Sequence, residues 1–256
     1  TRGAYDNAFR HSISKMAGLH FVASEVYRKR LIQMGEMPNN VHNVGGFGVD
    51  LIKKTVFLKK KILEKNLRIN FKKKNILVTF HPVTLENNTS QSQFSNLLKS
   101  LQKLKNTQII FTETNSDSYG NIINKMIKKF VKKHKNFSCS YKSMGQINYL
   151  STLKFIDAVV GNSSSGLLEA PSFKIGTINI GDRQMDRLKA TSVIDCDPKT
   201  KNIDQAIEKL YSKNFLKKIK KTKNPYGNGG ATNKTFSIIR SKNLDNLIKK
   251  KFFDFK

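Results

Sequence analysis

The chain has 256 residues, of which 38% are hydrophobic, and a formal net charge of +29. This length suffices for one large domain or two small ones with a substantial core. The sequence has no apolar run of about 18 residues and no signal-peptide pattern, so we expect no membrane span and no membrane partner. It begins with Thr1 instead of Met, and we therefore expect a fragment or a processed product.

The positive charge is carried mainly by lysine. Of the 47 basic residues, 39 are Lys and 8 are Arg, and they are spread through most of the chain. Nucleic-acid binding usually relies on Arg and interleaved aromatic residues. A general bias toward Lys, Asn and Ile explains the lysine runs at least as well. We therefore expect no nucleic-acid partner, and keep a basic nucleic-acid binder as a remote alternative.

Two cysteines, Cys139 and Cys196, are the only ones in the chain. They have no CxxC spacing and no paired histidine nearby, so neither a metal site nor a disulfide framework is expected. Isolated thiols suit a reducing compartment, and we predict a cytoplasmic protein.

The first 50 residues predict a small parallel unit. Apolar residues at helical spacing predict a helix over Asp6–Met16. A short strand within Leu19–Ser24, a helix over Glu25–Gly35 and a second strand within Asn40–Gly46 form a strand–helix–strand unit. A parallel sheet needs cover on both faces. This segment therefore either packs on a main domain or is the remnant of a larger N-terminal domain.

A longer alternation of strands and helices follows the charged, mostly helical stretch Val49–Lys74. Strands are predicted at 76–80, 107–113, 137–143, 155–161, 175–181 and 192–196, and helices at 93–104, 119–134, 147–153, 164–173 and 203–211. This pattern predicts an α/β fold, a Rossmann-like parallel sheet with covering helices. We expect a domain remnant over 1–50, the main domain over 51–225 and a helical tail over 226–256.

Ligands of open α/β sheets bind beyond the carboxyl ends of the strands. The polar candidates there are Thr79, His81, Thr112, Asn115, Ser143, Asn162 to Ser165 and Gly181 to Arg183. Ser163 to Ser165 precede a predicted helix, whose unpaired N–H groups favour an anion. One serine could act only as an N-cap, but one cap leaves two serines unexplained, so we favour a phosphate site. The string GNSSSG is one residue too long for a nucleophile elbow.

The candidates His81, Glu169 and Arg183 each allow two interpretations. His81 is either structural or a general acid or phosphate partner. Glu169 either accepts hydrogen bonds from ribose hydroxyls or balances the start of the helix. Arg183 either binds phosphate bidentately or pairs with a neighbouring aspartate.

Asp6 and Arg10, four residues apart on the first helix, also allow two interpretations. They form a helix salt bridge, or the carboxylate faces a cleft.

Four strings carry a family resemblance: RHSISKM, TFHPVT, GNSSSGLLEAPSFKIGTINIGDRQ and NPYGNGGA. In these the chain resembles the UDP-N-acetylglucosamine 2-epimerase family, most of all the hydrolysing branch that supplies N-acetylmannosamine-type sugars for sialic-acid-like nonulosonic acids. The resemblance implies the glycosyltransferase-B architecture of two Rossmann-like domains, of which this chain would be the C-terminal half. It also implies a UDP-sugar substrate bound between the domains, with no metal or NAD needed.

The resemblance implies roles for single residues. Ser163, Ser164 and Glu169 would hold the UDP phosphates and ribose, Asn115 would lie near the nucleotide, Arg183 and His81 would contact the diphosphate, and Asp6 and Arg10 would face the sugar. The implied reaction eliminates UDP across C1 and C2 and then hydrates the glycal with inversion at C2, with carboxylates moving the protons. Asp6, Arg10 and His81 would be its catalytic residues.

Two departures from the family pattern limit this expectation. Asn7 stands where the family has a second acid. The family's N-terminal domain, with a further catalytic acid on a glycine-rich loop, would lie before Thr1. We therefore expect weak UDP binding and no turnover from this chain, and a homo-oligomer for the full-length enzyme. A non-hydrolysing epimerase and a sugar transferase of the same architecture stay as alternatives.

Overall fold

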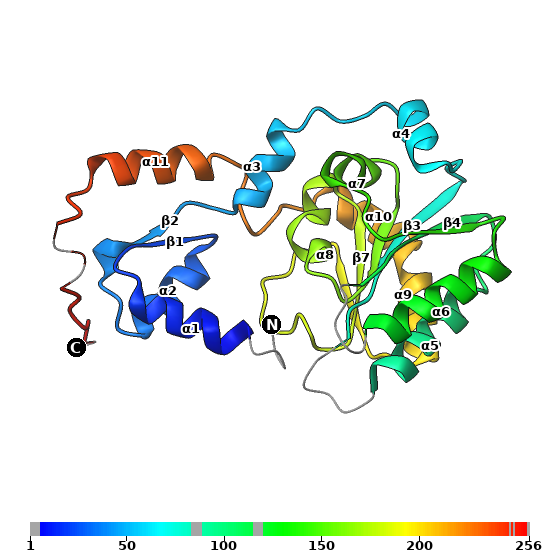
Figure 1. The fold of residues 1–256 in the computed structure, drawn as a ribbon, viewed down its shortest axis with the longest axis horizontal. Helices are drawn as coiled ribbons and strands as arrows, with labels where there is room; N and C mark the ends of the chain where they lie inside the picture. Colours follow the sequence, from blue (N-terminus) through cyan, green and yellow to red (C-terminus); the bar gives the residue numbers. More distant parts are fainter. Residues whose placement is uncertain (1–5, 83–88, 115–119, 246, 248, 255–256) are drawn as a thin grey trace. The chain divides into compact units, whose positions relative to one another are not determined.

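The computed structural model describes residues 6–82, 89–114, 120–245, 247 and 249–254, with the backbone alone at residues 6 and 7. The chain divides into two compact units. We call residues 55–223 the sheet unit. Residues 5–54 together with 224–256 form the second, which we call the terminal unit. The helices and strands of both are labelled in Figure 1.

The sheet unit is built on six parallel strands. These are β3 (Lys74–Thr79), β4 (Thr107–Thr112), β5 (Ser138–Tyr141), β6 (Ala158–Gly161), β7 (Gly176–Ile180) and β8 (Val193–Cys196). Their order is β5-β4-β3-β6-β7-β8. Both halves of the sheet therefore grow outward from the pair β3 and β6, which is the order of the Rossmann fold. This arrangement confirms the predicted Rossmann-like sheet.

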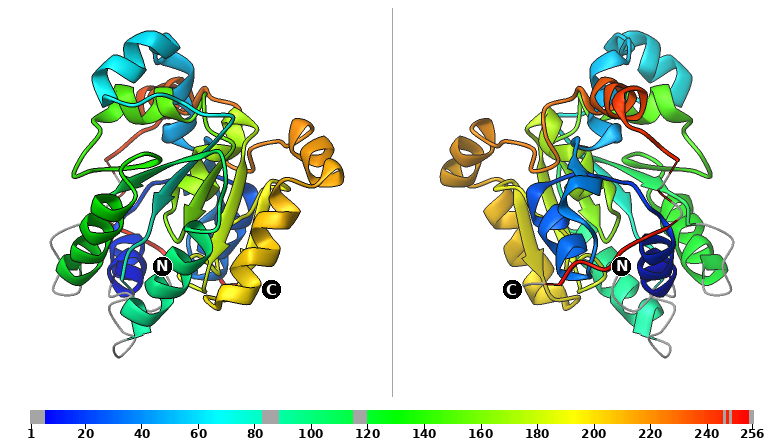
Figure 2. Two further views of the ribbon diagram at one scale, coloured as in Figure 1. Left: turned by 90° about the vertical axis from the view of Figure 1, so that its right-hand side faces the viewer. Right: turned by 90° about the vertical axis from the view of Figure 1, so that its left-hand side faces the viewer.

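Helices cover the sheet unit in two layers. They are α4 (Lys60–Leu67), α5 (Thr89–Leu101), α6 (Gly120–Lys133), α7 (Gln146–Thr152), α8 (Ser165–Leu168), the 3-10 helix η2 (Ala170–Phe173), α9 (Thr200–Leu210) and α10 (Lys213–Lys220). In the left view of Figure 2, α6 (green), α5 (teal) and α9 (yellow) lie side by side over one face, and α5 packs against both of the others. On the other face α4 packs on α7, while α8 contacts β6 and β7.

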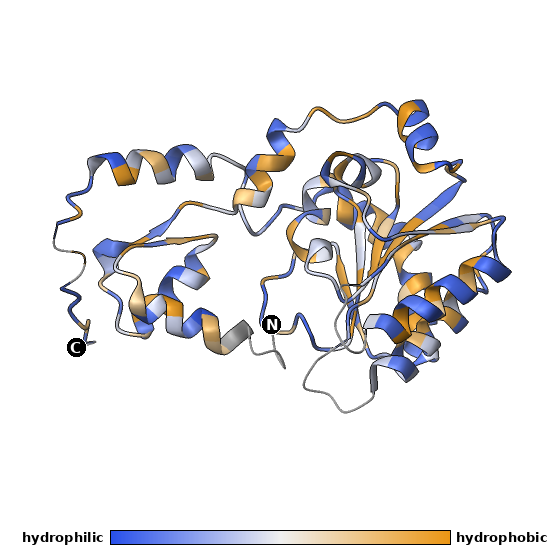
Figure 3. Ribbon diagram, in the orientation of Figure 1, coloured by the Kyte–Doolittle hydropathy of each residue, from blue (hydrophilic) through white to orange (hydrophobic). Residues whose placement is uncertain are grey.

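The core of the sheet unit follows from its sequence pattern. Ile76, Leu77 and Val78 of β3 are all buried, because a central parallel strand is covered on both faces. The helices carry both hydrophobic and hydrophilic residues along their length (Figure 3), as expected for helices with one buried side. In α5 the buried side is formed by Phe94, Leu97 and Leu101, at helical spacing.

One predicted helix of the sheet unit is wrong in its continuity. Instead of one helix over 164–173, the structure has the four residues of α8, a break at Glu169 and then η2. Pro171 explains the break, because it lacks an N–H group and its ring would clash with the carbonyl of Leu167 in a continuous α-helix.

The terminal unit combines segments from both ends of the sequence. Its elements are α1 (Asp6–Met16), β1 (His20–Val22), α2 (Glu25–Gln33), the 3-10 helix η1 (Pro38–Asn40), β2 (Val41–Asn43), α3 (Phe47–Lys54) and α11 (Ala231–Ser241). Strands β1 and β2 pair in parallel, which confirms the predicted strand–helix–strand unit. Ser24, two residues after β1, caps α2 by accepting a hydrogen bond from the Tyr27 N–H. The origin of residues 1–50 in a larger N-terminal domain stays a prediction.

Asp50 joins α3 to the start of α11 within the terminal unit. Its carboxylate accepts hydrogen bonds from the N–H groups of Gly230, Ala231 and Thr232. Gly229 and Gly230 have φ values of 89° and 90°, a backbone conformation that glycine adopts without strain. The glycine-rich string NPYGNGGA is therefore the turn that presents these N–H groups to Asp50.

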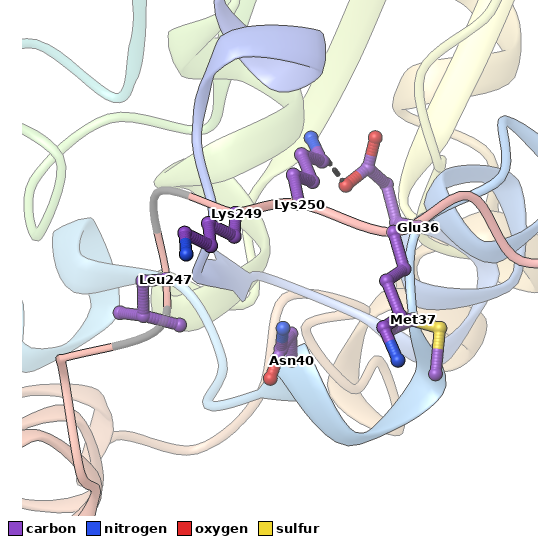
Figure 4. Close-up of a pocket in the computed structure, with 7 residues that line it drawn as sticks. Glu36, Met37, Asn40, Leu247, Lys249 and Lys250 are labelled. Atoms are coloured by element: carbon purple, nitrogen blue, oxygen red, sulfur yellow. Dashed lines mark ion pairs between the residues drawn. The ribbon is translucent and has the colours of Figure 1, made fainter.

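Glu36 is the centre of a buried ionic network in the same unit. It is 1% exposed, and its carboxylate lies 2.9 Å from Lys15 Nζ, 2.9 Å from His20 Nε2 and 2.6 Å from Lys250 Nζ. Burial raises the pKa of Glu36, but the hydrogen bonds from these three partners outweigh burial and lower it. Figure 4 shows Lys250 directed at this carboxylate at the edge of a small pocket. Both carboxylate oxygens have protein partners, which marks the network as structural.

Within the described ranges, none of the helices is long and apolar enough to cross a membrane.

Candidate functional site

The topological switch point lies between β3 and β6. Thr79 at the end of β3 is paired with Gly161 at the end of β6. A Cβ atom on Gly161 would lie 2.0 Å from the Thr79 carbonyl oxygen, and its φ is 132°, so only glycine fits here. Because the two strands end side by side, His81 and Asn162 follow from adjacent points of the sheet. Open α/β sheets bind ligands at this place.

Asn162 joins the two strand ends with its side chain. Its Oδ1 accepts a hydrogen bond from the His81 N–H, and its Nδ2 donates to the His81 carbonyl, both at 2.7 Å. Asn162 is 1% exposed, and Pro82, which follows His81, is also buried. The backbone of His81 is therefore held on both its donor and its acceptor side. This agrees with the predicted position of His81 beyond the carboxyl end of its strand. Asn162 was predicted only as one of the polar strand-end candidates, without this role.

The loop after β7 reaches the same asparagine. Gly181, with a φ of 74°, turns the chain there. Arg183 Nη1 and Gln184 Nε2 both donate to the backbone carbonyl of Asn162, at 3.0 and 2.9 Å. The predicted residues His81 and Arg183 thus both contact Asn162, the first at its side chain and the second at its backbone carbonyl. The buried Gln184 was missed, because nothing in its sequence surroundings distinguishes it from a surface glutamine.

The serine row lies in the loop between β6 and α8. Ser163 and Ser164 are partly exposed, whereas Ser165 is buried. Ser164 occupies the N-cap position of α8, but its side chain makes no capping hydrogen bond. A cap therefore does not account for Ser164. Ser163 Oγ accepts a hydrogen bond from the Ser165 N–H at 3.3 Å, which stabilises the turn.

The anion-binding argument from a long helix does not hold for α8. A macrodipole needs several turns of aligned peptide groups, and α8 has four residues. An anion at this loop would depend on hydroxyl and backbone donors and on the side chains of His81 and Arg183.

Glu169 lies behind the serine row, at the break between α8 and η2. Burial raises the pKa of its carboxyl group, while a hydrogen bond with Ser165 and the charge of Arg187 lower it in part. Its Oε2 is buried and has no hydrogen-bond partner among the residues that the structure describes. A half-buried carboxylate with one unused oxygen is suited to accept a hydrogen bond from a ligand hydroxyl.

Tyr149 on α7 extends this arrangement. Its hydroxyl donates a short hydrogen bond to Ser165 Oγ, so a chain of contacts runs from Tyr149 through Ser165 to Glu169. Burial raises the pKa of Tyr149, which keeps its hydroxyl a donor at neutral pH. The sequence did not reveal this residue, because Tyr149 is one partly apolar side chain on an amphipathic helix.

Two other strand-end candidates of the sheet unit, Thr79 and Thr112, form a hydrogen bond between their hydroxyl groups, with an Oγ1–Oγ1 distance of 2.5 Å. Ser143 is exposed in the loop after β5 and accepts a hydrogen bond from the Gly145 N–H at 3.2 Å. These three residues are accounted for by local structure. Asn115 lies outside the described residues.

The catalytic candidates of the first helix lie in the terminal unit. Asp6 begins α1, and its side chain is outside the described part of the chain. Arg10 is exposed on the same helix. Their roles toward a sugar stay predictions.

Comparisons with known proteins identify the family of this chain. A family model described as UDP-N-acetylglucosamine 2-epimerase matches residues 1–240. The chain is 44% identical over 255 residues to a GDP/UDP-N,N'-diacetylbacillosamine 2-epimerase (hydrolyzing) of Campylobacter jejuni, covering 99% of this chain and 66% of the relative. It is 37% identical over 251 residues to the polysialic acid biosynthesis protein P7 of Escherichia coli, covering 96% of this chain and 63% of that protein.

A solved structure shows the same fold. The S. aureus MnaA structure with UDP has a TM-score of 0.74 and 19% identity, covering 95% of this chain and 65% of that one. The likeness confirms the predicted fold class, a Rossmann-like sheet of the glycosyltransferase-B type. The chain spans less than two thirds of the length of each of these three proteins. The family match over 240 residues, together with 44% identity to a relative, shows that this chain belongs to the UDP-N-acetylglucosamine 2-epimerase family.

Proposed function

We propose that this chain supplies the nucleotide-binding part of a hydrolysing UDP-sugar 2-epimerase. The observation that carries the proposal is the meeting of three loops at Asn162, which brings His81 and Arg183 together beside the serine row. A guanidinium, an imidazole and a row of hydroxyls at a Rossmann switch point suit the diphosphate of a nucleotide. Family membership supports the same assignment.

Each part of the nucleotide has a proposed partner. The diphosphate lies against Arg183, His81 and the hydroxyls of Ser163 and Ser164. The half-buried Glu169 accepts from the ribose hydroxyls through its unused oxygen. Asn115 is proposed to lie near the nucleotide, as the family resemblance implies.

The proposed reaction takes place in two steps. A base removes the proton at C2 of the sugar while the C1–O bond breaks and UDP leaves, which forms a 2-acetamidoglucal. Water then adds to the glycal, with its hydroxyl at C1. A proton returns to C2 on the face opposite to the one from which the first proton was removed, and the 2-epimeric sugar is released. The cations around the diphosphate stabilise the leaving group. Asp6 and Arg10 act at the sugar, with His81 between the sugar and the diphosphate.

The substrate is UDP-N-acetylglucosamine, giving N-acetylmannosamine, or a 2,4-diacetamido-trideoxy relative. The name of the Campylobacter relative supports the second. Residues 1–50 are proposed to be the remnant of the N-terminal Rossmann-like domain, and residues 51–225 the UDP-binding domain. The present chain would then bind UDP weakly and release none from a UDP-sugar. The cytoplasmic location and the homo-oligomeric state of the full-length enzyme also stay proposals.

UDP binding to the chain is tested by thermal unfolding. Ligand at 100 times its Kd stabilises a protein by about 2.7 kcal/mol, so millimolar UDP should raise the Tm. Ser164→Ala and Glu169→Ala should reduce the shift. Ser143→Ala and Glu208→Ala are matched controls, because both side chains are exposed elsewhere in the sheet unit. A chain whose Tm is unaffected by UDP would contradict the proposal.

Product analysis separates the candidate reactions. UDP-N-acetylglucosamine is incubated with a form of this protein that spans the full length of its relatives. Proton NMR should then show UDP and free N-acetylmannosamine. UDP-N-acetylmannosamine would indicate a non-hydrolysing epimerase, and release of UDP only with an added acceptor would indicate a sugar transferase. Release of UDP by the 256-residue chain at an ordinary enzymatic rate would refute the expectation that it lacks part of the sugar site.

A further inference from the structure

All polar groups of Asn162 are engaged at the switch point. Its N–H donates to the Thr79 carbonyl at 3.2 Å, its own carbonyl accepts from Arg183 and Gln184, and its side-chain amide pairs with the His81 backbone in both directions. The residue is 1% exposed. Asn162 therefore has hydrogen bonds to the loops after both β3 and β7.

The pairing with His81 needs an amide. Two neighbouring side-chain atoms must respectively accept from the N–H and donate to the C=O of one residue, and among side chains of this size only the asparagine amide offers a separate acceptor oxygen and donor nitrogen. The two bonds of 2.7 Å extend the β3–β6 pairing past the end of the strands. They fix the point from which the His81 side chain leaves the backbone.

We propose that Asn162 is a positioning residue that sets the places of His81 and Arg183 for the diphosphate of the bound nucleotide sugar. The proposal rests on the proposed function, in which these two side chains contact the diphosphate. Asn162 acts on the imidazole through the His81 backbone and on the guanidinium through its own carbonyl. It has no contact with the ligand in this role.

The chain contains a matched control for this arrangement. Asn75, at the start of β3, makes the same paired contact with a backbone. Its Oδ1 accepts from the Lys72 N–H at 2.8 Å, and its Nδ2 donates to the Lys72 carbonyl at 2.9 Å. Asn75 is also buried, at 6% exposed. It lies at the amino end of the same strand, so its loss removes the same contacts at the opposite edge of the sheet.

The test measures the Kd for UDP by calorimetry on the full chain. Asn162→Ala should weaken binding roughly tenfold or more, the ratio that corresponds to one or two buried hydrogen bonds. Asn75→Ala should lower the Tm by a similar amount but leave the Kd for UDP within about twofold. Asn162→Ser, which retains one hydrogen-bonding group, should lie between wild type and Asn162→Ala and replaces the latter if that variant is unfolded.

A double-mutant cycle with His81→Ala distinguishes positioning from general loss of structure. If Asn162 acts through His81, Asn162→Ala should have a smaller effect on the Kd in the His81→Ala background than in wild type. Equal effects in both backgrounds, or an unchanged Kd in folded Asn162→Ala and Asn162→Ser, would overturn the positioning role. Absence of UDP binding by the wild-type chain would instead overturn the proposed function, and the positioning role with it.

Discussion

Removing the charge of Asp50 should destabilise the terminal unit. The Asp50 carboxylate accepts three backbone N–H groups at the start of α11 and is 6% exposed. Hydrogen bonds from Thr232 come first among the causes that lower its pKa to about 2, with Gly230 and Ala231 adding to them and burial opposing them. In Asp50→Asn, one acceptor oxygen is replaced by an amide that has no acceptor to donate to.

The expected loss is about 2 kcal/mol, the upper range for an N-cap residue and a charge-assisted hydrogen bond. Hydrogen exchange measured by mass spectrometry should show faster exchange in residues 230–241, because α11 loses its N-terminal support. Asp245→Asn is a matched control, since this aspartate is exposed on the segment after α11. Its exchange rates should equal those of wild type.

The stabilisation by Asp50 should depend on pH. The folded pKa of Asp50 lies below its ordinary value of 3.8. Its stabilisation is therefore fully present above about pH 4 and is lost as the pH falls from there toward about 2. The stability difference between wild type and Asp50→Asn should shrink over this window. An equal difference at pH 6 and pH 2.5, or no difference at pH 6, would refute the argument.

Three further variants test other parts of the structure. Glu36→Ala should cost about 3 kcal/mol, because it removes the buried carboxylate that Lys15, His20 and Lys250 share. Its urea midpoint should lie below that of the exposed-site variant Glu25→Ala. Because the pKa of Glu36 is lowered, acid should reduce this difference. Gly161→Ala should lower the free energy of unfolding by more than about 2 kcal/mol or fail to fold, since its Cβ would overlap the Thr79 carbonyl. A variant that melts at the wild-type Tm, as followed by circular dichroism, would contradict this. Tyr149→Phe should weaken UDP binding about fivefold, a loss of about 1 kcal/mol, because Ser165 and Glu169 lose the support of the Tyr149 hydroxyl. Tyr211→Phe should leave the Kd measured by calorimetry unchanged. Equal Kd values for the two variants would exclude the proposed contact chain.

The elements that depend on local sequence were predictable. The strand predicted at 76–80 is apolar except for Thr79, as expected of a buried parallel strand, and it overlaps β3 (Lys74–Thr79). The first helix has the predicted bounds Asp6–Met16. The helix expected over 164–173 failed because the apolar spacing was weighed without Pro171. A proline four residues after Leu167 excludes a continuous helix at that carbonyl, and this information was present in the sequence.

Contacts between distant segments were not predictable in this way. His81 and Asn162 are 81 residues apart, and Asp50 and Gly230 are 180 apart. Their meeting depends on the strand order and on the return of the C-terminal segment to the terminal unit. A strand-end rule shows that each side chain lies at one edge of the sheet, but it does not show which strands are neighbours. The role of Asn162 follows only when β3 and β6 are known to pair.

The structure also changes the physical basis of phosphate recognition at this site. A long helix after the serine row would attract an anion through its dipole, and that attraction would need no particular side chain. With only four residues in α8, anion binding depends on side chains such as Arg183 and His81, which are useful only at defined positions. A buried asparagine that contacts both of their loops meets this requirement. The serines then bind the diphosphate beside Arg183 and His81, and the string GNSSSG has no role as a nucleophile.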